Sequence, residues 1–224
     1  MEYKKPGWDE QYYHGWTNRY PFTDVVSFVM QNYSQASPRS DVKILDLGCG
    51  GGHHLTFLAQ EGFEYHGVDG SAQAIKIAHE RLEARSFSTK NVIQATFDAL
   101  PYPDNFFDAV IDRGALVCNH GSEIKDLLVE IRRVMKPGGK MISTIIHESD
   151  TNRVGATDLG NNDYTNFPGR LKDAGVLHFT SGKDAADLFS IFDINDLQLQ
   201  TFRSDYPPAN NPTISAWMLI TCSK

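Results

Sequence analysis

The sequence predicts a three-layer α/β sandwich built on a seven-stranded, mostly parallel sheet whose last strand is antiparallel. Short apolar runs alternate along the chain with segments whose apolar residues recur at helical spacing. A glycine-rich loop follows the first of these runs, and only a short turn separates the last two. At 224 residues, with no linker-like composition, the chain is expected to form one domain over residues 1–224.

The amino-terminal stretch, residues 1–40, is rich in aromatic side chains. Those between residues 8 and 33 are Trp8, Tyr12, Tyr13, Trp16, Tyr20, Phe22, Phe28 and Tyr33. Apolar spacing predicts a helix over residues 24–33, followed by a loop to residue 40. Most of these rings are expected to pack on the edge of the sheet. Tyr12, Tyr13 and Trp16 are also candidates to face a ligand.

The first strand and its glycine loop organise the prediction. Residues 42–47 form an apolar run that is typical of a strand buried on both faces. Gly48, Gly50, Gly51 and Gly52 follow, so the backbone must turn sharply and something must approach it closely. A helix begins by Leu55, and its amino end brings N–H groups and a positive dipole to the loop.

The residues around the loop narrow the choice of ligand. A dinucleotide fingerprint needs a third glycine where this chain has His53. Asp46, just before the loop, would repel a pyrophosphate but attract an ammonium group. The pattern therefore favours a zwitterion joined to a nucleoside over a diphosphate.

The remaining elements follow the same alternation. Strands are predicted at residues 64–69, 92–97, 106–116, 140–146, 197–204 and 213–222. Helices are predicted around residues 75–82 and 124–134 and over 183–191. Residues 148–181 show no regular pattern, and we expect an irregular insertion that is either a substrate-shaping lid or a surface loop. The turn at residues 206–212 is too short for a parallel crossover, so the last two strands must form an antiparallel hairpin.

Two motifs carry a resemblance to a known family. The run Asp46-Leu47-Gly48-Cys49-Gly50-Gly51-Gly52 resembles the first motif of class I S-adenosylmethionine-dependent methyltransferases. The run Val-Met-Lys-Pro-Gly-Gly-Lys at residues 134–140 resembles a late motif of the same class. The resemblance implies a Rossmann-like fold, S-adenosylmethionine as cofactor, S-adenosylhomocysteine as product, and an amino-terminal segment that closes over the cofactor.

Candidate cofactor-binding residues lie at the ends of the first four strands. They are Asp46, Gly48, Cys49 and Gly50 at the loop, Asp69 and Gly70 after the second strand, Asp98, Ala99 and Leu100 after the third, and Arg113 after the fourth. Asp69 stands about twenty residues beyond the loop, where an acid can accept both ribose hydroxyls. Its alternative role is a helix cap, for which Ser71 is the better candidate. Asp98 is expected to accept the adenine amine, and Leu100 to contact the adenine face.

The acceptor side is predicted from strand ends and loops. His147 and His120 are the candidate general bases, because histidine is the usual proton acceptor at neutral pH. Tyr13, Trp16, Cys118 and His178 are the candidate substrate-binding residues. His53 and His54 are adjacent, but consecutive helical residues point about 100° apart, so we expect no metal there.

Composition restricts the partners. The net charge of −7 and pI near 5.6 argue against a protein that binds long phosphate backbones. Three cysteines without CxxC spacing, no signal-peptide core and no membrane-length apolar run favour a reduced cytoplasmic setting. Residues 112–115 lack the Asn/Asp-Pro-Pro-aromatic run of base-methylating enzymes, so DNA is not the expected acceptor.

The function expected is in-line methyl transfer to a small polar molecule through an oxygen or nitrogen acceptor. Alternatives are a protein or RNA acceptor, a non-catalytic S-adenosylmethionine-binding protein and, less favoured, a nicotinamide oxidoreductase. The sequence leaves the oligomeric state open.

Overall fold

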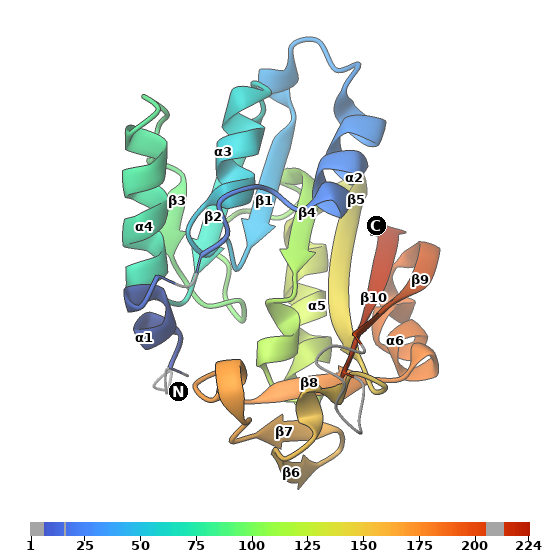
Figure 1. The fold of residues 1–224 in the computed structure, drawn as a ribbon. Helices are drawn as coiled ribbons and strands as arrows, with labels where there is room; N and C mark the ends of the chain where they lie inside the picture. The colour runs from blue at the N-terminus through green and yellow to red at the C-terminus, as the bar shows by residue number, and fades with distance from the viewer. Residues whose placement is uncertain (1–6, 16, 205–212) are drawn as a thin grey trace.

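A twisted, mostly parallel sheet forms the centre of the molecule (Figure 1). The computed structural model describes residues 7–15, 17–204 and 213–224, so the predictions for Trp16 and for the turn at residues 206–212 fall outside the described residues. The seven main strands lie in the order β3-β2-β1-β4-β5-β10-β9. Their bounds are β1 Lys43–Leu47, β2 Glu64–Asp69, β3 Val92–Gln94, β4 Phe107–Arg113, β5 Met135–His147, β9 Asp193–Ser204 and β10 Thr213–Ser223.

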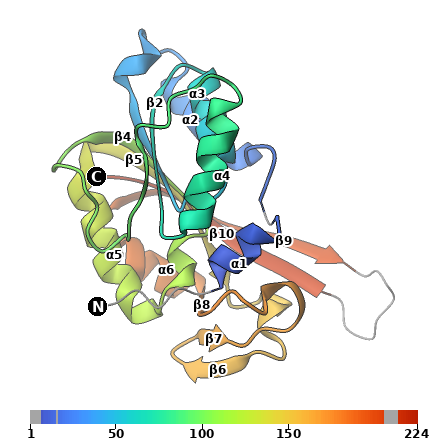
Figure 2. The same cartoon turned by 90° about the vertical axis from the view of Figure 1, so that its left-hand side faces the viewer.

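Strand directions agree with the prediction. β1 pairs in parallel with β2 and β4, and the parallel run continues to β3 on one side and β5 on the other. β10 is antiparallel to both β5 and β9, and the β9–β10 pair extends from the body of the molecule (Figure 2). The predicted sandwich with a reversed last strand is confirmed.

Several strand boundaries differ from the predictions. β3 ends at Gln94 instead of residue 97. β5 begins at Met135 instead of Lys140, because Phe107 pairs with Met135 while Ala109 pairs with Lys140, and the residues between form a bulge. β9 begins at Asp193, since the polar residues before Leu197 also pair with β10. These polar residues lie on an edge strand. There apolar and polar residues alternate less clearly, so the sequence pattern that predicts a strand is weak.

Helices cover both faces of the sheet. α2 (Thr23–Tyr33) and α3 (His53–Gln60) pack through Val25, Phe28 and Leu58 against one face, with Ile44 and Ile111 beneath them. α4 (Ala72–Glu83) packs beside α3 over β2 and β3. The other face is covered by α5 (Gly121–Val134), α6 (Gly182–Leu188) and the short turn η5 (Phe189–Ile191).

The expectation that residues 148–181 are irregular was wrong. The segment contains β6 (Thr157–Gly160), β7 (Asp163–Thr165) and β8 (Leu177–Thr180), with the short helical turns η3 (Thr151–Arg153) and η4 (Gly169–Leu171). β8 continues the main sheet in parallel with β5, and β7 and β6 follow antiparallel. Strands of three or four residues are too short for alternation to be visible in a sequence. We call residues 148–181 the insertion.

Two elements lie beyond the carboxyl ends of β1, β2 and β4. The insertion is one of them, and α1 (Trp8–Tyr13), which packs against α4, is the other (Figure 1). Among the described residues, no helix is both long and apolar enough to cross a membrane.

Candidate active site

The glycine loop after β1 is held by its own backbone. Gly48, Gly50 and Gly52 have φ values of +68°, +51° and +74°, a region that favours glycine. A Cβ on Gly48 would lie 2.3 Å from the Cβ of Ala115, so no larger residue fits there. The N–H groups of Gly48 and Cys49 both donate to the carbonyl of Val68, at 2.8 and 3.0 Å. The loop is therefore fixed to β2 without any ligand.

Asp69 lies at the end of β2 beside this loop. Its carboxylate accepts the N–H of Gly50 at 2.9 Å and the N–H of Ser71 at 2.8 Å. Burial raises the pKa of Asp69 to about 6 and the charges of Asp46 and Asp9 add to this, while the two N–H donors oppose it. Ser71 is the cap of α4, as predicted, since its hydroxyl accepts the N–H of Ala74 at 3.0 Å. Asp69 is thus left without a capping role.

A buried polar cluster lies under the loop at the start of α3. Asp46 Oδ1 lies 3.1 Å from Nδ1 of His54. The ring centres of His53 and His54 are 4.0 Å apart, with their planes tilted by 52°. Burial lowers the pKa of His53 to about 2, helped by neighbouring His54, Arg81 and Arg113, so the imidazole is neutral.

Several atoms of this cluster are buried with no hydrogen-bond partner among the described residues. They are Asp46 Oδ2, both ring nitrogens of His53, Nε2 of His54 and one terminal guanidinium nitrogen of Arg81. Unpaired buried polar atoms are costly, and they mark places where a ligand or water completes the bonding. A site that offers both hydrogen-bond acceptors and hydrogen-bond donors is suited to a zwitterion, which carries an ammonium and a carboxylate group.

α1 brings Tyr12 to the site. A Cβ on Gly50 would lie 2.6 Å from the hydroxyl oxygen of Tyr12, so this hydroxyl packs directly against the glycine loop. Burial raises the pKa of Tyr12, and Asp69, Cys49 and Cys118 raise it further. Tyr13, in contrast, is 74% exposed with its ring against His14, and its position does not support the predicted substrate contact.

Gln11, also on α1, is a residue that sequence reasoning missed. Its side chain is 6% exposed, yet neither amide atom has a hydrogen-bond partner among the described residues. A buried amide with open donors and acceptors is suited to a polar ligand.

The predicted adenine-binding residues have mixed positions. Asp98 and Ala99 are exposed, while Leu100 is buried. The N–H of Leu100 donates to Glu130 at 2.8 Å, so that group is already engaged. Phe97, not predicted, lies near Gly48, with its ring 3.6 Å from where a Cβ on that glycine would be. The carbonyl of Gly70 accepts the side-chain amide of Gln94 at 2.9 Å.

Arg113 is held by protein groups. It donates to Asp24 and to Thr144, each at 3.1 Å, and its guanidinium lies 4.2 Å from the ring centre of Phe22 and 5.4 Å from that of Trp217. This position joins α2 to the sheet, and its predicted cofactor contact stays a prediction.

Three residues from separate elements meet beside the turn η2 (Leu116–Cys118), which contacts β8. Asp163 of β7 lies 2.9 Å from Nδ1 of His120 and 2.7 Å from Nδ1 of His178, and it accepts the N–H of Gly121 at 3.0 Å. Burial raises the pKa of Asp163, but the bonds from Gly121, His120 and His178 outweigh it and hold the pKa below its usual value. The prediction placed His120 and His178 on the acceptor side, and the structure brings them together on a carboxylate that it missed.

Cys118 links this cluster to the cofactor side. Burial raises the pKa of its thiol, and Asp112 and Asp69 add to the shift, which places Asp69 within electrostatic range. Asp112 itself is buried and accepts the N–H groups of Ala115 and Leu116 and the hydroxyl of Ser143, so it shapes the turn.

His147 has a different environment from His120. Its Nδ1 accepts the N–H of Ser149 at 3.1 Å and lies 2.7 Å from that residue's hydroxyl. A neutral imidazole whose Nδ1 accepts a hydrogen bond carries its proton on Nε2, and that nitrogen cannot then take another. The geometry therefore favours His120 over His147 as a base. In the described ranges, no group of three or more His, Cys, Asp or Glu side chains is arranged to hold a metal ion.

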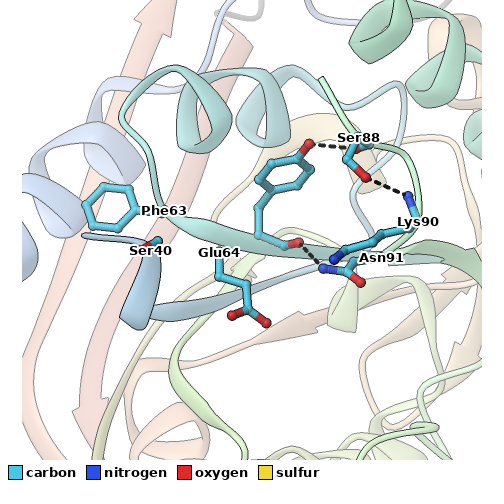
Figure 3. A pocket seen from close by; sticks show the side chains of 7 residues that line it. Ser40, Phe63, Glu64, Ser88, Lys90 and Asn91 are labelled. Carbon is cyan, nitrogen blue, oxygen red and sulfur yellow. Dashed lines mark hydrogen bonds between the residues drawn. The ribbon is translucent and has the colours of Figure 1, made fainter. Parts of the chain in front are cut away.

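Two hollows lie outside the glycine loop, and Arg113, Asp24 and Phe22 line part of the second. One, of about 290 Å³, is at the amino end of β2 between Phe63, Glu64 and Ser88 (Figure 3). Tyr65 and Asn91 in its wall bond to neighbouring groups, the hydroxyl of Tyr65 donating to the carbonyl of Ser88. The other, of about 870 Å³, is a polar groove between α2 and the β9–β10 pair.

Comparison with known proteins assigns the class. A family model described as a methyltransferase domain matches residues 38–176. The chain belongs to this methyltransferase-domain family, and S-adenosylmethionine is the methyl donor of the class whose fold it has. The resemblance seen in the glycine loop and in residues 134–140 is thereby confirmed.

The curated relatives align with only part of this chain. The uncharacterized methyltransferase YcgJ of Bacillus subtilis is 28% identical over 107 residues, 48% of this chain and 42% of that protein. Demethylmenaquinone methyltransferase of Anoxybacillus flavithermus is 28% identical over 124 residues, 54% of this chain and 52% of that protein. The human mitochondrial ubiquinone biosynthesis O-methyltransferase is 28% identical over 158 residues, 63% of this chain and 40% of that protein. The chain thus spans about half or less of the length of these relatives.

Solved structures share the whole fold. An S-adenosylmethionine-dependent methyltransferase from Methanosarcina mazei superposes with a TM-score of 0.71 at 18% identity, over 92% of this chain and 98% of that one. The 1,6-didemethyltoxoflavin-N1-methyltransferase of Burkholderia thailandensis, with bound 1,6-didemethyltoxoflavin and S-adenosylhomocysteine, superposes with a TM-score of 0.66 at 16% identity. The match covers 96% of this chain and 84% of that one. At such identities the likeness shows the fold.

Proposed function

We propose that this chain transfers the methyl group of S-adenosylmethionine to a small polar molecule with an oxygen or nitrogen acceptor. The observation that carries the proposal is the row of groups at the carboxyl ends of β1 and β2. There a fixed glycine loop, the carboxylate of Asp69 and the unpaired polar atoms around Asp46 and His53 lie side by side.

The residues present fit this cofactor. Asp69 offers a carboxylate to the two ribose hydroxyls. Asp46 has one free oxygen for an ammonium group, and His53 and Arg81 have free nitrogens near the loop for the carboxylate of the amino-acid end. Phe97 and Leu100 supply apolar surface for the adenine. When bound, the cofactor supplies a methyl group on a positively charged sulfur.

The protein's own part is to position the acceptor. Displacement at a methyl carbon needs the nucleophile and the leaving group in line, and such alignment is worth orders of magnitude in rate. Tyr12 and Gln11 on α1, and His120 at the start of α5, are polar groups that could orient an acceptor near the loop.

A small acceptor is supported by the names of similar proteins. The relatives include enzymes named for demethylmenaquinone and for ubiquinone biosynthesis, and one structural neighbour is named for didemethyltoxoflavin. The acidic net charge of −7 agrees with an acceptor other than nucleic acid. The cytoplasmic setting and the exclusion of DNA stay predictions from the sequence.

Calorimetry and a transfer assay together test the proposal. S-adenosylhomocysteine should bind with micromolar or better affinity while NADH gives no heat, and a metabolite extract incubated with methyl-labelled S-adenosylmethionine should yield a labelled small molecule. Absence of heat with S-adenosylhomocysteine contradicts the cofactor assignment. Binding without any labelled product would instead identify a cofactor-binding protein that does not catalyse transfer, and label in protein or RNA would move the acceptor to a macromolecule.

A further inference from the structure

We propose that Asp163 is a positioning residue that makes His120 the proton acceptor for methylation of a hydroxyl group, with His178 as a second imidazole on the same carboxylate. The inference rests on the proposed function and deepens it by naming the acceptor class. It concerns the three residues described above, which we call the His–Asp–His cluster: His120, Asp163 and His178.

The hydrogen-bond pattern fixes the tautomer of both rings. An ionised carboxylate can only accept, so the two Nδ1 atoms 2.9 and 2.7 Å away must both carry protons. Each neutral imidazole then has its lone pair on Nε2. This is the tautomer that a general base needs, and a carboxylate on Nδ1 also stabilises the imidazolium that forms when the base takes a proton.

Exposure separates the roles of the two histidines. The side chain of His120 is 47% exposed, whereas those of His178 and Asp163 are nearly buried. His120 can therefore contact the hydroxyl group that is methylated, while Asp163 and His178 hold the ring of His120 in place.

In the part of the chain that the structure describes, the charged partners of Asp163 are both histidines. The ion pairs of Asp163 within the described residues are with the two histidines, and no lysine or arginine is among them. With both rings neutral the cluster carries a charge of −1 in a nearly buried place, and one added proton neutralises it. Two further titratable groups are close to His120 in the chain: Glu123, whose carboxylate accepts the backbone N–H of His120 at 3.2 Å, and Cys118 on η2.

The packing of Gly121 shows that the second ring is built into the arrangement. A Cβ on Gly121 would lie 2.3 Å from Cε1 and 2.5 Å from Nδ1 of His178. The ring of His178 thus occupies the space that the side chain of any residue other than glycine would need at position 121. That position directly follows His120 in the chain.

Location connects the cluster to the methyl donor. β8, which carries His178, contacts η2. Ala115 directly precedes η2, and its Cβ lies 2.3 Å from where a Cβ on Gly48 of the glycine loop would be. The chain passes from Cys118 to His120 in two residues. His120 therefore stands on the acceptor side of the candidate cofactor site.

The step balances as follows. The acceptor oxygen forms a bond to the methyl carbon while the carbon–sulfur bond breaks, and the sulfur keeps that electron pair and becomes neutral. The hydroxyl proton moves to Nε2 of His120. A hydroxyl is a poor nucleophile until this proton leaves, so a base of this kind suits a phenol or enol, whereas a neutral amine attacks with its own lone pair.

Histidine tautomers measured by NMR test the proposal without any acceptor. In protein labelled with ¹⁵N-histidine, His120 and His178, assigned with His120→Gln and His178→Gln, should both show the Nδ1–H form above their titration. In Asp163→Asn the His120 signal should change to the Nε2–H form that free histidine prefers. Gly121→Ala should perturb His178, while Gly182→Ala, whose Cβ would meet only Met218 at 4.0 Å, should leave both rings unchanged. An Nε2–H form of His120 in the unaltered protein, or no change in Asp163→Asn, overturns the proposal.

A kinetic arm distinguishes this inference from the proposed function. With the labelled acceptor from the extract, Asp163→Asn should lower kcat about 10–100-fold, while S-adenosylhomocysteine affinity stays within twofold. If the unaltered protein does not bind S-adenosylhomocysteine, the proposed function is refuted. Normal cofactor binding with unchanged kcat in Asp163→Asn, or methyl transfer to an amine nitrogen, refutes the inference alone.

Discussion

Two carboxylates stand on the carboxyl side of the same sheet, and their surroundings are opposite. Asp69 accepts two backbone N–H groups, and burial raises its pKa to about 6. Asp163 is also nearly buried, yet two imidazoles and one N–H hold its pKa below the usual value. Among the described residues Asp69 has no cationic partner, and its carboxylate is suited to neutral hydroxyl donors. The second is built to share protons with histidine.

The largest effect expected from this comparison is on turnover. His120→Ala should lower kcat about 10²–10⁴-fold, the usual contribution of a general base, while cofactor affinity changes little. His147→Ala is the matched control, because its Nδ1 already accepts the Ser149 N–H. Labelled-methyl transfer measures both. A large loss in His147→Ala with normal turnover in His120→Ala would reverse the assignment of the base.

The second effect is on cofactor affinity. Asp69→Ala removes the acceptor for two hydroxyl donors, and at about 1.5–3 kcal/mol for each bond to a charged group the affinity should fall about 10²-fold or more. Glu64→Ala, at the amino end of the same strand, should leave it unchanged. Calorimetry with S-adenosylhomocysteine measures both, and unaltered binding in Asp69→Ala would remove this carboxylate from the site.

A tenfold effect is expected from pH. The ionised form of Asp69 is the one that accepts hydroxyl donors, so affinity is full above its pKa of about 6 and falls as the pH drops through that value. Between pH 7.5 and pH 5 the affinity for S-adenosylhomocysteine should fall about tenfold. In Asp69→Asn this slope should be absent, and a slope that persists would assign the titration to another group.

The smallest effect concerns the two neighbouring tyrosines of α1. Tyr12→Phe removes a hydroxyl that rests on Gly50 and should weaken cofactor binding about threefold to tenfold, the range of one neutral hydrogen bond. Tyr13→Phe should have no effect, because that side chain is 74% exposed. Equal effects in both variants would show that α1 acts through the helix as a whole.

The two regions also differ in how far the sequence could predict them. The glycine loop, the position of Asp69 at a strand end and the antiparallel last pair were predictable because each depends on one short segment. Backbone turns need glycine, and parallel strands bring their ends to one edge. Leu100 follows β3, but a sequence cannot show that Glu130, thirty residues away, accepts its N–H.

The His–Asp–His cluster was only partly predictable. His120 and His178 could be named as candidates from their places near strand ends, but their common partner, Asp163, lies in a three-residue strand that has no visible pattern. Tyr12 and Tyr13 are adjacent in the sequence, and only the direction in which α1 packs distinguishes them. One signal was available: Gly121 follows His120 where no turn requires glycine, which indicates close packing by another group.

The route of the chain through the insertion has a consequence for how such enzymes diversify. Asp163 and His178 belong to a segment that leaves the sheet after β5 and returns to it through β8, whereas the loop, Asp46 and Asp69 precede residue 70. Replacing residues 148–181 would exchange Asp163 and His178 and leave the glycine loop, Asp46 and Asp69 unchanged. Under the proposed function, the methyl acceptor could then be varied independently of the methyl donor.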